Sequence, residues 1–118
     1  MRRIVLYHNP RCSKSRRALE LLREGGYDIQ VREYLKEPLS SGELEILIRK
    51  IGILPNQLIR TTEMIFKKLE IGNVQDLSKE RCVELLVEHP ELLERPILET
   101  EEKACVGRPP ELILDILG

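Results

Sequence analysis

Residues 3–16 read RIVLYHNPRCSKSR, and this stretch decides the fold that we predict. Its first part, Arg3 to Tyr7, is a short apolar run of the kind found in strands that are buried on both faces. Cys12 stands directly before a helical pattern that runs from Ser13 to Glu24. A thiol at a helix N-terminus lies beside unpaired backbone N–H groups and the positive end of the helix dipole. We therefore expect Cys12 to have a lowered pKa and to act as a nucleophile.

The neighbours of Cys12 separate two interpretations of a free cysteine. Most free cysteines are small buried hydrophobic residues, which suits Cys82 on the apolar stripe of a predicted helix and Cys105 in a predicted strand. Cys12 instead stands among Arg11, Lys14 and Arg16. The cationic and polar surroundings favour a reactive thiol and would also attract an oxyanion.

The remaining pattern predicts an α/β chain. Strand signals continue at Ile29–Leu35, so the first part predicts a parallel βαβ unit. Helices follow in the middle: one with a capping box at Ser40 and Glu43 that Gly52 ends, one around Thr62 to Leu69, and one from Ser78 to His89 that Pro90 stops. The last part predicts a hairpin of Pro96–Glu99 and Ala104–Val106, then a helix opened by Pro109 and Pro110.

This order is that of a thioredoxin-like fold, βαβ then ββα, with a helical insertion at about residues 40–93 between the two halves. We expect residues 1–118 to form one domain, because the chain has the length of one domain and shows no linker or repeat. In such a fold the reactive cysteine follows the first strand, as Cys12 does. The X-Pro bond before the third strand is often cis there, which predicts a cis bond at Arg95–Pro96.

Composition narrows the possible partners. The chain has 19 basic and 20 acidic residues, a balance that gives no general attraction to nucleic acid or membranes. Three cysteines in a chain of this size are typical of reduced thiols in the cytoplasm. The near-neutral charge makes a monomer the default expectation.

Several motifs are missing from the sequence, and their absence shapes the predicted chemistry. Ser15 occupies the place that a second cysteine would take in a C-x-x-C motif, so reduction of Cys12 needs an external thiol. Ala18 stands where a C-x5-R oxyanion loop would have its arginine. No His/Cys cluster has metal-ligand spacing, and we predict neither a bound metal nor a bound cofactor.

Oxyanion binding must then come from distant arginines, because forked guanidinium groups match tetrahedral oxyanions. Three are candidates: Arg60, Arg95 and Arg108. A solvated surface charge is the alternative for each, and spacing alone favours a function only for Arg95. Glu94 is also placed to pair with a neighbouring arginine and make it structural. For His8, a role beside the thiolate and a role as a plain loop residue are about equally supported.

At this point the chain resembles a known family, the glutaredoxin-coupled arsenate reductases (the ArsC family) with their Spx-like relatives. The matching segments are colinear and extend over nearly all of the 118 residues: Tyr7 to Cys12 with Ser15 and Arg16, Tyr34–Leu35 with Pro38, Leu58 to Thr61, Glu88 to Pro90, Glu94 to Ile97, and Gly107 to Glu111.

The resemblance implies that Cys12 attacks arsenate, with His8 and Ser15 supporting its low pKa. It implies that Arg60, Arg95 and Arg108 form the oxyanion cage. Glutathione would then be a co-substrate, and glutaredoxin the partner that regenerates the cysteine. Two alternatives stay open: an Spx-like regulator that binds RNA polymerase, and a glutathione-dependent thiol oxidoreductase with another substrate. Spx-like proteins commonly carry C-x-x-C, so Ser15 argues against the first.

Overall fold

The computed structural model describes residues 3–117, which divide into two compact units. The first unit contains the residues up to 37 together with those from 95 onward, and we call it the sheet unit. The second is Pro38–Glu94, which we call the helical unit. Within residues 3–117, no helix has the length and apolar content that crossing a membrane requires.

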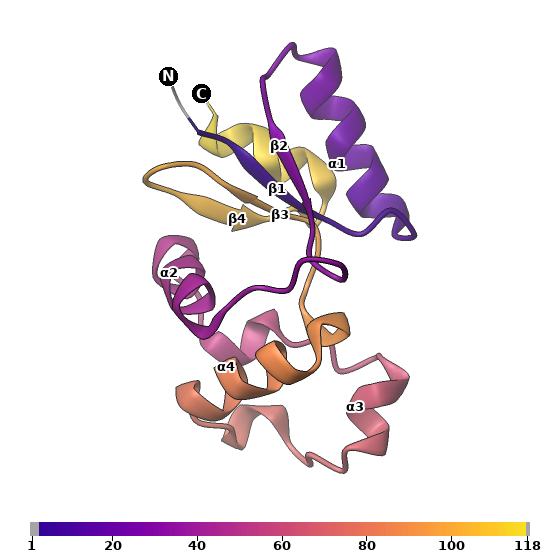
Figure 1. The fold of residues 1–118 in the computed structure, drawn as a ribbon, viewed down its shortest axis with the longest axis vertical. Helices are drawn as coiled ribbons and strands as arrows, with labels where there is room; N and C mark the ends of the chain where they lie inside the picture. The colour runs from indigo at the N-terminus through magenta and orange to yellow at the C-terminus, as the bar shows by residue number, and fades with distance from the viewer. Residues whose placement is uncertain (1–2, 118) are drawn as a thin grey trace. The chain divides into compact units, whose positions relative to one another are not determined.

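The sheet unit is built on four strands in the order β2-β1-β3-β4 (Figure 1). The central strand β1 (Val5–His8) pairs in parallel with β2 (Gln30–Glu33) and antiparallel with β3 (Ile97–Glu99). β3 pairs antiparallel with β4 (Ala104–Val106). The predicted βαβ and ββ order is therefore confirmed, and it places the end of β1 and the start of β3 beside each other at the middle of the sheet.

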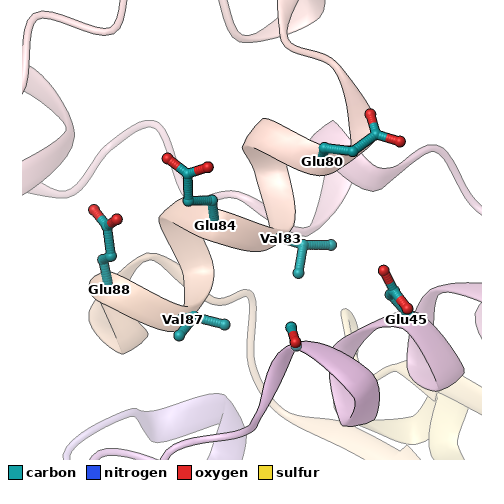
Figure 2. A pocket seen from close by; sticks show the side chains of 7 residues that line it. Glu45, Glu80, Val83, Glu84, Val87 and Glu88 are labelled. Atoms are coloured by element: carbon teal, nitrogen blue, oxygen red, sulfur yellow. The ribbon is translucent and has the colours of Figure 1, made fainter.

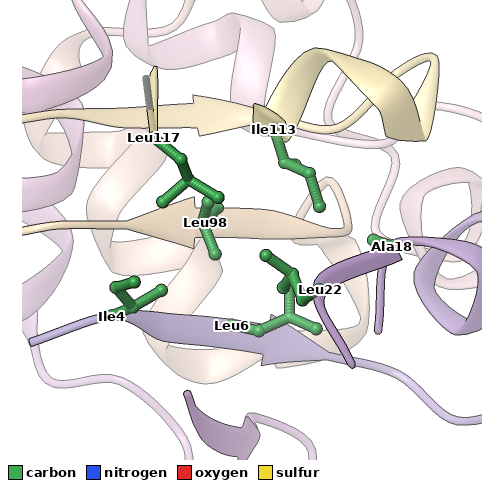
Figure 3. Close-up of a cluster of buried hydrophobic side chains, with 7 residues drawn as sticks. All are labelled: Ile4, Leu6, Ala18, Leu22, Leu98, Ile113 and Leu117. Atoms are coloured by element: carbon green, nitrogen blue, oxygen red, sulfur yellow. The ribbon is translucent and has the colours of Figure 1, made fainter. Parts of the chain in front are cut away.

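One face of this sheet carries the core of the unit, which Figure 3 shows in close-up. The helix α1 (Ser13–Glu24) and the 3₁₀ helix η4 (Pro110–Ile116) pack against it. The core side chains come from Ile4 just before β1, from the strands (Leu6 and Leu98), from α1 (Ala18 and Leu22) and from the C-terminal segment (Ile113 and Leu117). Their burial fixes the start of α1, and with it Cys12, against β1.

Two elements differ from the sequence prediction. The last helix is 3₁₀ rather than α-helical, with the Leu112 N–H donating to the Pro109 carbonyl three residues back at 3.0 Å; a segment this short satisfies its backbone with such tighter bonds. β2 is shorter than Ile29–Leu35, and Val31 and Leu35 are 37% and 44% exposed. Because β2 is an edge strand, its apolar residues need not all face a core.

The helical unit contains the three predicted helices, α2 (Ser41–Ile51), α3 (Met64–Lys68) and α4 (Lys79–Glu88). The capping box at Ser40 and Glu43 is present, and Gly52 ends α2 at φ 75°, in the left-handed region that glycine favours. Short 3₁₀ turns join these helices: η1 (Pro55–Leu58), η2 (Val74–Asp76) and η3 (Pro90–Leu92).

Candidate active site

Cys12 occupies the N-cap position of α1, at the end of a loop of residues 9–12 that we call the Cys12 loop. Asn9 holds this loop. Its carbonyl accepts the Cys12 N–H at 3.0 Å, and its side-chain Oδ1 accepts the Arg11 N–H at 3.0 Å. Asn9 is only 8% exposed, so these bonds are shielded from competing water. The backbone that carries the thiol is therefore fixed before any substrate arrives.

A buried pair of side chains, His8 and Ser15, contacts the backbone at the start of the Cys12 loop. His8 Nδ1 lies 2.7 Å from Ser15 Oγ, and the same Oγ accepts the Asn9 N–H at 3.0 Å. Burial lowers the pKa of His8 below its usual value; the nearby Glu33 opposes this, and Arg23 and Arg16 add to it. His8 is therefore neutral at neutral pH, and its Nδ1 shares a hydrogen bond with the Ser15 hydroxyl. Sequence reasoning assigned His8 and Ser15 to the site, and the structure brings both beside the Cys12 loop.

The pKa of Cys12 is lowered, as its place at the helix start predicts. Partial burial pushes this pKa upward, because removing water disfavours the thiolate. The backbone N–H groups of Ser15 and Lys14, together with the guanidinium of Arg95, stabilise the thiolate and outweigh burial. The neutral thiol makes no side-chain cap hydrogen bond, so these donors act mainly on the negative charge of the ionised sulfur.

The source of this shift differs in part from the expectation. The sequence pointed to the charges of Arg11, Lys14 and Arg16, whose side chains are exposed. Arg16 instead donates through its guanidinium to the Pro10 carbonyl at 3.0 Å, where it braces the Cys12 loop. The strongest favourable contributions come from backbone N–H groups and from Arg95, which is far away in the sequence.

Arg95, just before β3, and Arg108, just after β4, lie together at the open end of the hairpin. The Arg108 Nε donates to the Arg95 carbonyl at 3.1 Å, and the Gly107 N–H donates to the Pro96 carbonyl at 2.8 Å. Gly107 permits this close approach, since a Cβ there would stand 2.9 Å from Pro96 Cγ. The Arg95–Pro96 bond is cis, as predicted, and the Arg108–Pro109 bond is cis as well.

Arg60 belongs to the helical unit, where two carboxylates hold it. Its Nε lies 3.2 Å from Glu63, and its Nη1 lies 3.4 Å from Glu94. The isolated bridge between Ile59 and Leu93 anchors the backbone beside it. Glu94 thus pairs with Arg60, one of the arginines considered for it in the sequence. A role of Arg60 in an oxyanion cage stays a prediction.

The other two cysteines lie in different surroundings. Cys82 is fully buried on α4, and burial raises its pKa. Cys105 packs against the core of the sheet unit, where burial, with the Asp115 carboxylate adding to it, raises its pKa to about 11. Both thiols are therefore protonated at neutral pH, as the prediction of structural cysteines requires. Over residues 3–117, no group of three or more His, Cys, Asp and Glu side chains is arranged to hold a metal ion.

Asn9 is the residue of this site that sequence reasoning missed. A signal was present, because an Asn-Pro pair marks a turn and an asparagine side chain often accepts the N–H two residues on. That signal is common at the surface of proteins, and it says nothing of a nearby thiol. Only the structure shows that Asn9 bonds to the backbone N–H groups of Arg11 and Cys12 and so holds the loop.

The model of the ArsC family matches residues 7–116. The chain belongs to the ArsC family. It is 41% identical over 115 residues to an arsenate reductase of Haemophilus influenzae, covering 97% of this chain and 98% of that protein. It is also 40% identical over 118 residues to the uncharacterized protein YfgD of Escherichia coli, covering 99% of this chain and 98% of YfgD.

The fold is shared with a solved ArsC-family structure. An arsenate reductase from Vibrio cholerae superposes with a TM-score of 0.89 at 40% identity, covering 96% of each chain. This likeness confirms the thioredoxin-like α/β fold class that the order of strands and helices predicts.

Proposed function

We propose that this ArsC-family protein is an arsenate reductase in which Cys12 is the nucleophile. The observation that carries the proposal is the lowered pKa of a partly exposed thiol, stabilised by backbone N–H groups and by Arg95. Groups that stabilise a thiolate also attract an oxyanion, so the substrate is drawn to the atom that attacks it. The arsenate reductases among its relatives support the choice of arsenate.

In the first step the Cys12 thiolate attacks arsenic(V) of arsenate. An S–As bond forms, and one As–O bond breaks, with the oxygen leaving as water after protonation. Arsenic stays in the +5 state at this point. Arg95 and Arg108 bind the arsenate oxygens, and their guanidinium groups offset the charge that grows on them in the transition state. Arg60 is proposed as the third member of this cage.

In the second step glutathione supplies the electrons. Its thiolate attacks the Cys12 sulfur, the S–As bond breaks, and arsenic keeps the electron pair and leaves as arsenite. Each of the two sulfurs is oxidised by one electron and they form a mixed disulfide. Glutaredoxin then attacks the glutathione sulfur and releases the Cys12 thiolate. An external reductant is needed because Ser15 occupies the place of a second cysteine.

His8 and Ser15 serve this cycle by position. Their buried contact holds the first turn of α1, and the Ser15 N–H reaches the sulfur from that turn. Since His8 is neutral, it adds no charge that would compete with Arg95 for the oxyanion. A reaction that consumes reduced glutathione also fits the predicted cytoplasmic location.

A coupled assay tests the proposal. The purified protein is mixed with arsenate, glutathione, glutaredoxin, glutathione reductase and NADPH, and the loss of NADPH is followed. We expect turnover that depends on arsenate and on both thiol components, and that falls to background in Cys12→Ser. Cys82→Ser serves as the matched control, because this buried thiol has no part in the steps above.

Two outcomes would reject the assignment. Turnover on a glutathione mixed disulfide without any response to arsenate would identify a thiol oxidoreductase instead. If the protein turned over neither arsenate nor the mixed disulfide but bound purified RNA polymerase subunits, it would be a regulator.

A further inference from the structure

A groove between α2 and α4 in the helical unit plays no part in the proposed reaction. Its volume is about 340 Å³, and Figure 2 shows it from close by. Both helices contribute side chains to it, and these are Ser41, Glu45, Glu80, Val83, Glu84, Val87 and Glu88. The groove therefore combines an aliphatic part with a rim of carboxylates.

The aliphatic part is formed by α4. Val83 and Val87 are four residues apart and so point to the same side of the helix, as Figure 2 shows. Val83 is buried, whereas Val87 is 38% exposed. Val87 thus leaves apolar surface open to solvent in the groove, and covering it with another aliphatic group would be favourable.

The carboxylates are regularly spaced. Glu80, Glu84 and Glu88 repeat every four residues along α4, and Glu45 lines the groove from α2. In Figure 2 the side chains of Glu84 and Glu88 extend outward from α4, and Val83 and Val87 lie toward α2. Residues four apart on a helix lie about 6 Å from each other, so the three form one row. Among the seven lining residues of the described chain, none is basic. Arg81 pairs with Glu84, but both side chains are exposed, and such a pair exchanges readily for another.

The geometry points to a docking site for a basic amphipathic helix of a partner protein. Aliphatic side chains of that helix would cover Val87, and lysines or arginines repeating every four residues would pair with the row of glutamates. The groove is too small to enclose a whole helix, so only its apolar stripe enters. The same charges disfavour anionic membranes and acidic peptides, which would be repelled.

A labelled synthetic helix tests this inference. The probe carries a leucine stripe flanked by lysines at four-residue intervals, and fluorescence anisotropy measures its affinity for the full chain at about 0.15 M salt. We expect saturable binding that weakens as salt is added. A second probe with every lysine replaced by glutamate should not bind.

Variants of the groove assign the binding to these residues. Glu84→Lys with Glu88→Lys should weaken binding roughly tenfold or more, because two attractive pairs become repulsive. Val87→Ser should weaken it about threefold to fivefold through lost apolar contact. The matched controls are Glu101→Lys with Glu102→Lys, in the exposed hairpin loop, and Val31→Ser, an equally exposed valine; neither should change the affinity.

Other results would overturn the inference. Equal affinity for the lysine and glutamate probes would mean that charge does not select the occupant. Binding that survives the double reversal would place the contact elsewhere. Dimerisation in sedimentation that disappears with Glu84→Lys and Glu88→Lys would show that a second copy of the chain occupies the groove. Arsenate turnover of these variants is measured in parallel. A result against the docking site can then be told apart from a result against the proposed arsenate reductase activity.

Discussion

Cys12 and Cys105 both lie in the sheet unit, but the pKa of Cys12 is lowered and that of Cys105 is raised. Both cysteines are partly exposed, and in both the largest single effect is partial burial, which raises the pKa of the thiol. At Cys12, backbone N–H groups and Arg95 reverse this tendency and the pKa falls. At Cys105 the added neighbour is the carboxylate of Asp115, and the pKa rises to about 11.

The difference teaches that exposure alone does not identify a reactive cysteine. The start of a helix directs N–H groups at a side chain, whereas a strand directs its N–H groups at the next strand. Cys105 sits on β4, where its backbone pairs with that of Leu98 on β3 rather than pointing at a thiol. Its sulfur is left as a weak donor that approaches the Leu112 carbonyl at 3.9 Å.

The largest expected difference between the two regions is in alkylation. Iodoacetamide reacts with thiolates, so its rate at each cysteine follows the ionised fraction. At pH 7, a thiol with a pKa of about 11 is ionised in only about one molecule in ten thousand. We expect native Cys12 to react at least about a hundredfold faster than Cys105, with peptide mass spectrometry as the measurement. The Cys12 rate should reach its plateau at a lower pH than that of free cysteine, because the pKa is lowered. Equal rates at the two positions would contradict the comparison.

The next largest effect is expected at Arg95. Arg95→Ala removes a guanidinium from the thiolate and from the proposed cage, so the pKa of Cys12 should rise. We expect arsenate KM to increase and kcat/KM to fall about a hundredfold, the usual loss for one oxyanion donor. The fold should stay intact, because the Arg108 Nε bonds to the Arg95 backbone carbonyl, which alanine retains.

A matched surface arginine gives the control for this variant. Arg17→Ala removes a guanidinium from α1 that pairs with the exposed Glu20. It should leave both the kinetics and the pKa of Cys12 unchanged. Thiolate absorbance against pH and the coupled assay measure the two readouts separately. Unchanged kinetics in Arg95→Ala would remove this residue from the cage.

The sequence predicted well what depends on local patterns. The capping box at Ser40, the end of α2 at Gly52 and the position of Cys12 before α1 follow from residues a few places apart, and the structure confirms each. The hairpin before residue 107 was also predicted from its polar loop, in which the Thr100 N–H bonds to the Lys103 carbonyl.

What the sequence did not predict depends on long-range neighbours. The exposure of Val31 follows from the edge position of β2, which no local pattern reveals. The sequence favoured a function for Arg95 but not its weight: the acidity of Cys12 owes more to Arg95, which the pairing of β3 with β1 brings near, than to the adjacent arginines. The cage role of Arg60 comes from family resemblance and stays a prediction; the structure shows its ion pairs with Glu63 and Glu94.

A smaller effect is expected at Asn9, where the side chain fixes the Cys12 loop by one bond to the Arg11 N–H. Asn9→Ala should slow Cys12 alkylation and arsenate turnover by about fivefold, the equivalent of one ordinary hydrogen bond. Asn73→Ala is the control, because Asn73 makes the same kind of bond to the Gln75 N–H at the same 3.0 Å. Asn9→Ala should lose more stability in urea unfolding, because Asn9 is buried and Asn73 is exposed. If Asn73→Ala slowed alkylation equally, the effect would be one of stability and not of position.

The smallest effect is expected on the other side of the comparison, at Asp115. Its carboxylate raises the pKa of Cys105, but less than burial does. The Asp115 side chain is exposed, so salt screens its charge. Asp115→Asn should lower the pKa of Cys105 slightly and speed its alkylation at pH 9 by about twofold. The Cys12 rate in the same sample serves as the internal control and should not change. An increase at Cys105 that exceeds tenfold would mean that the carboxylate, rather than burial, keeps this thiol protonated, and the contrast with Cys12 would then depend on charge alone.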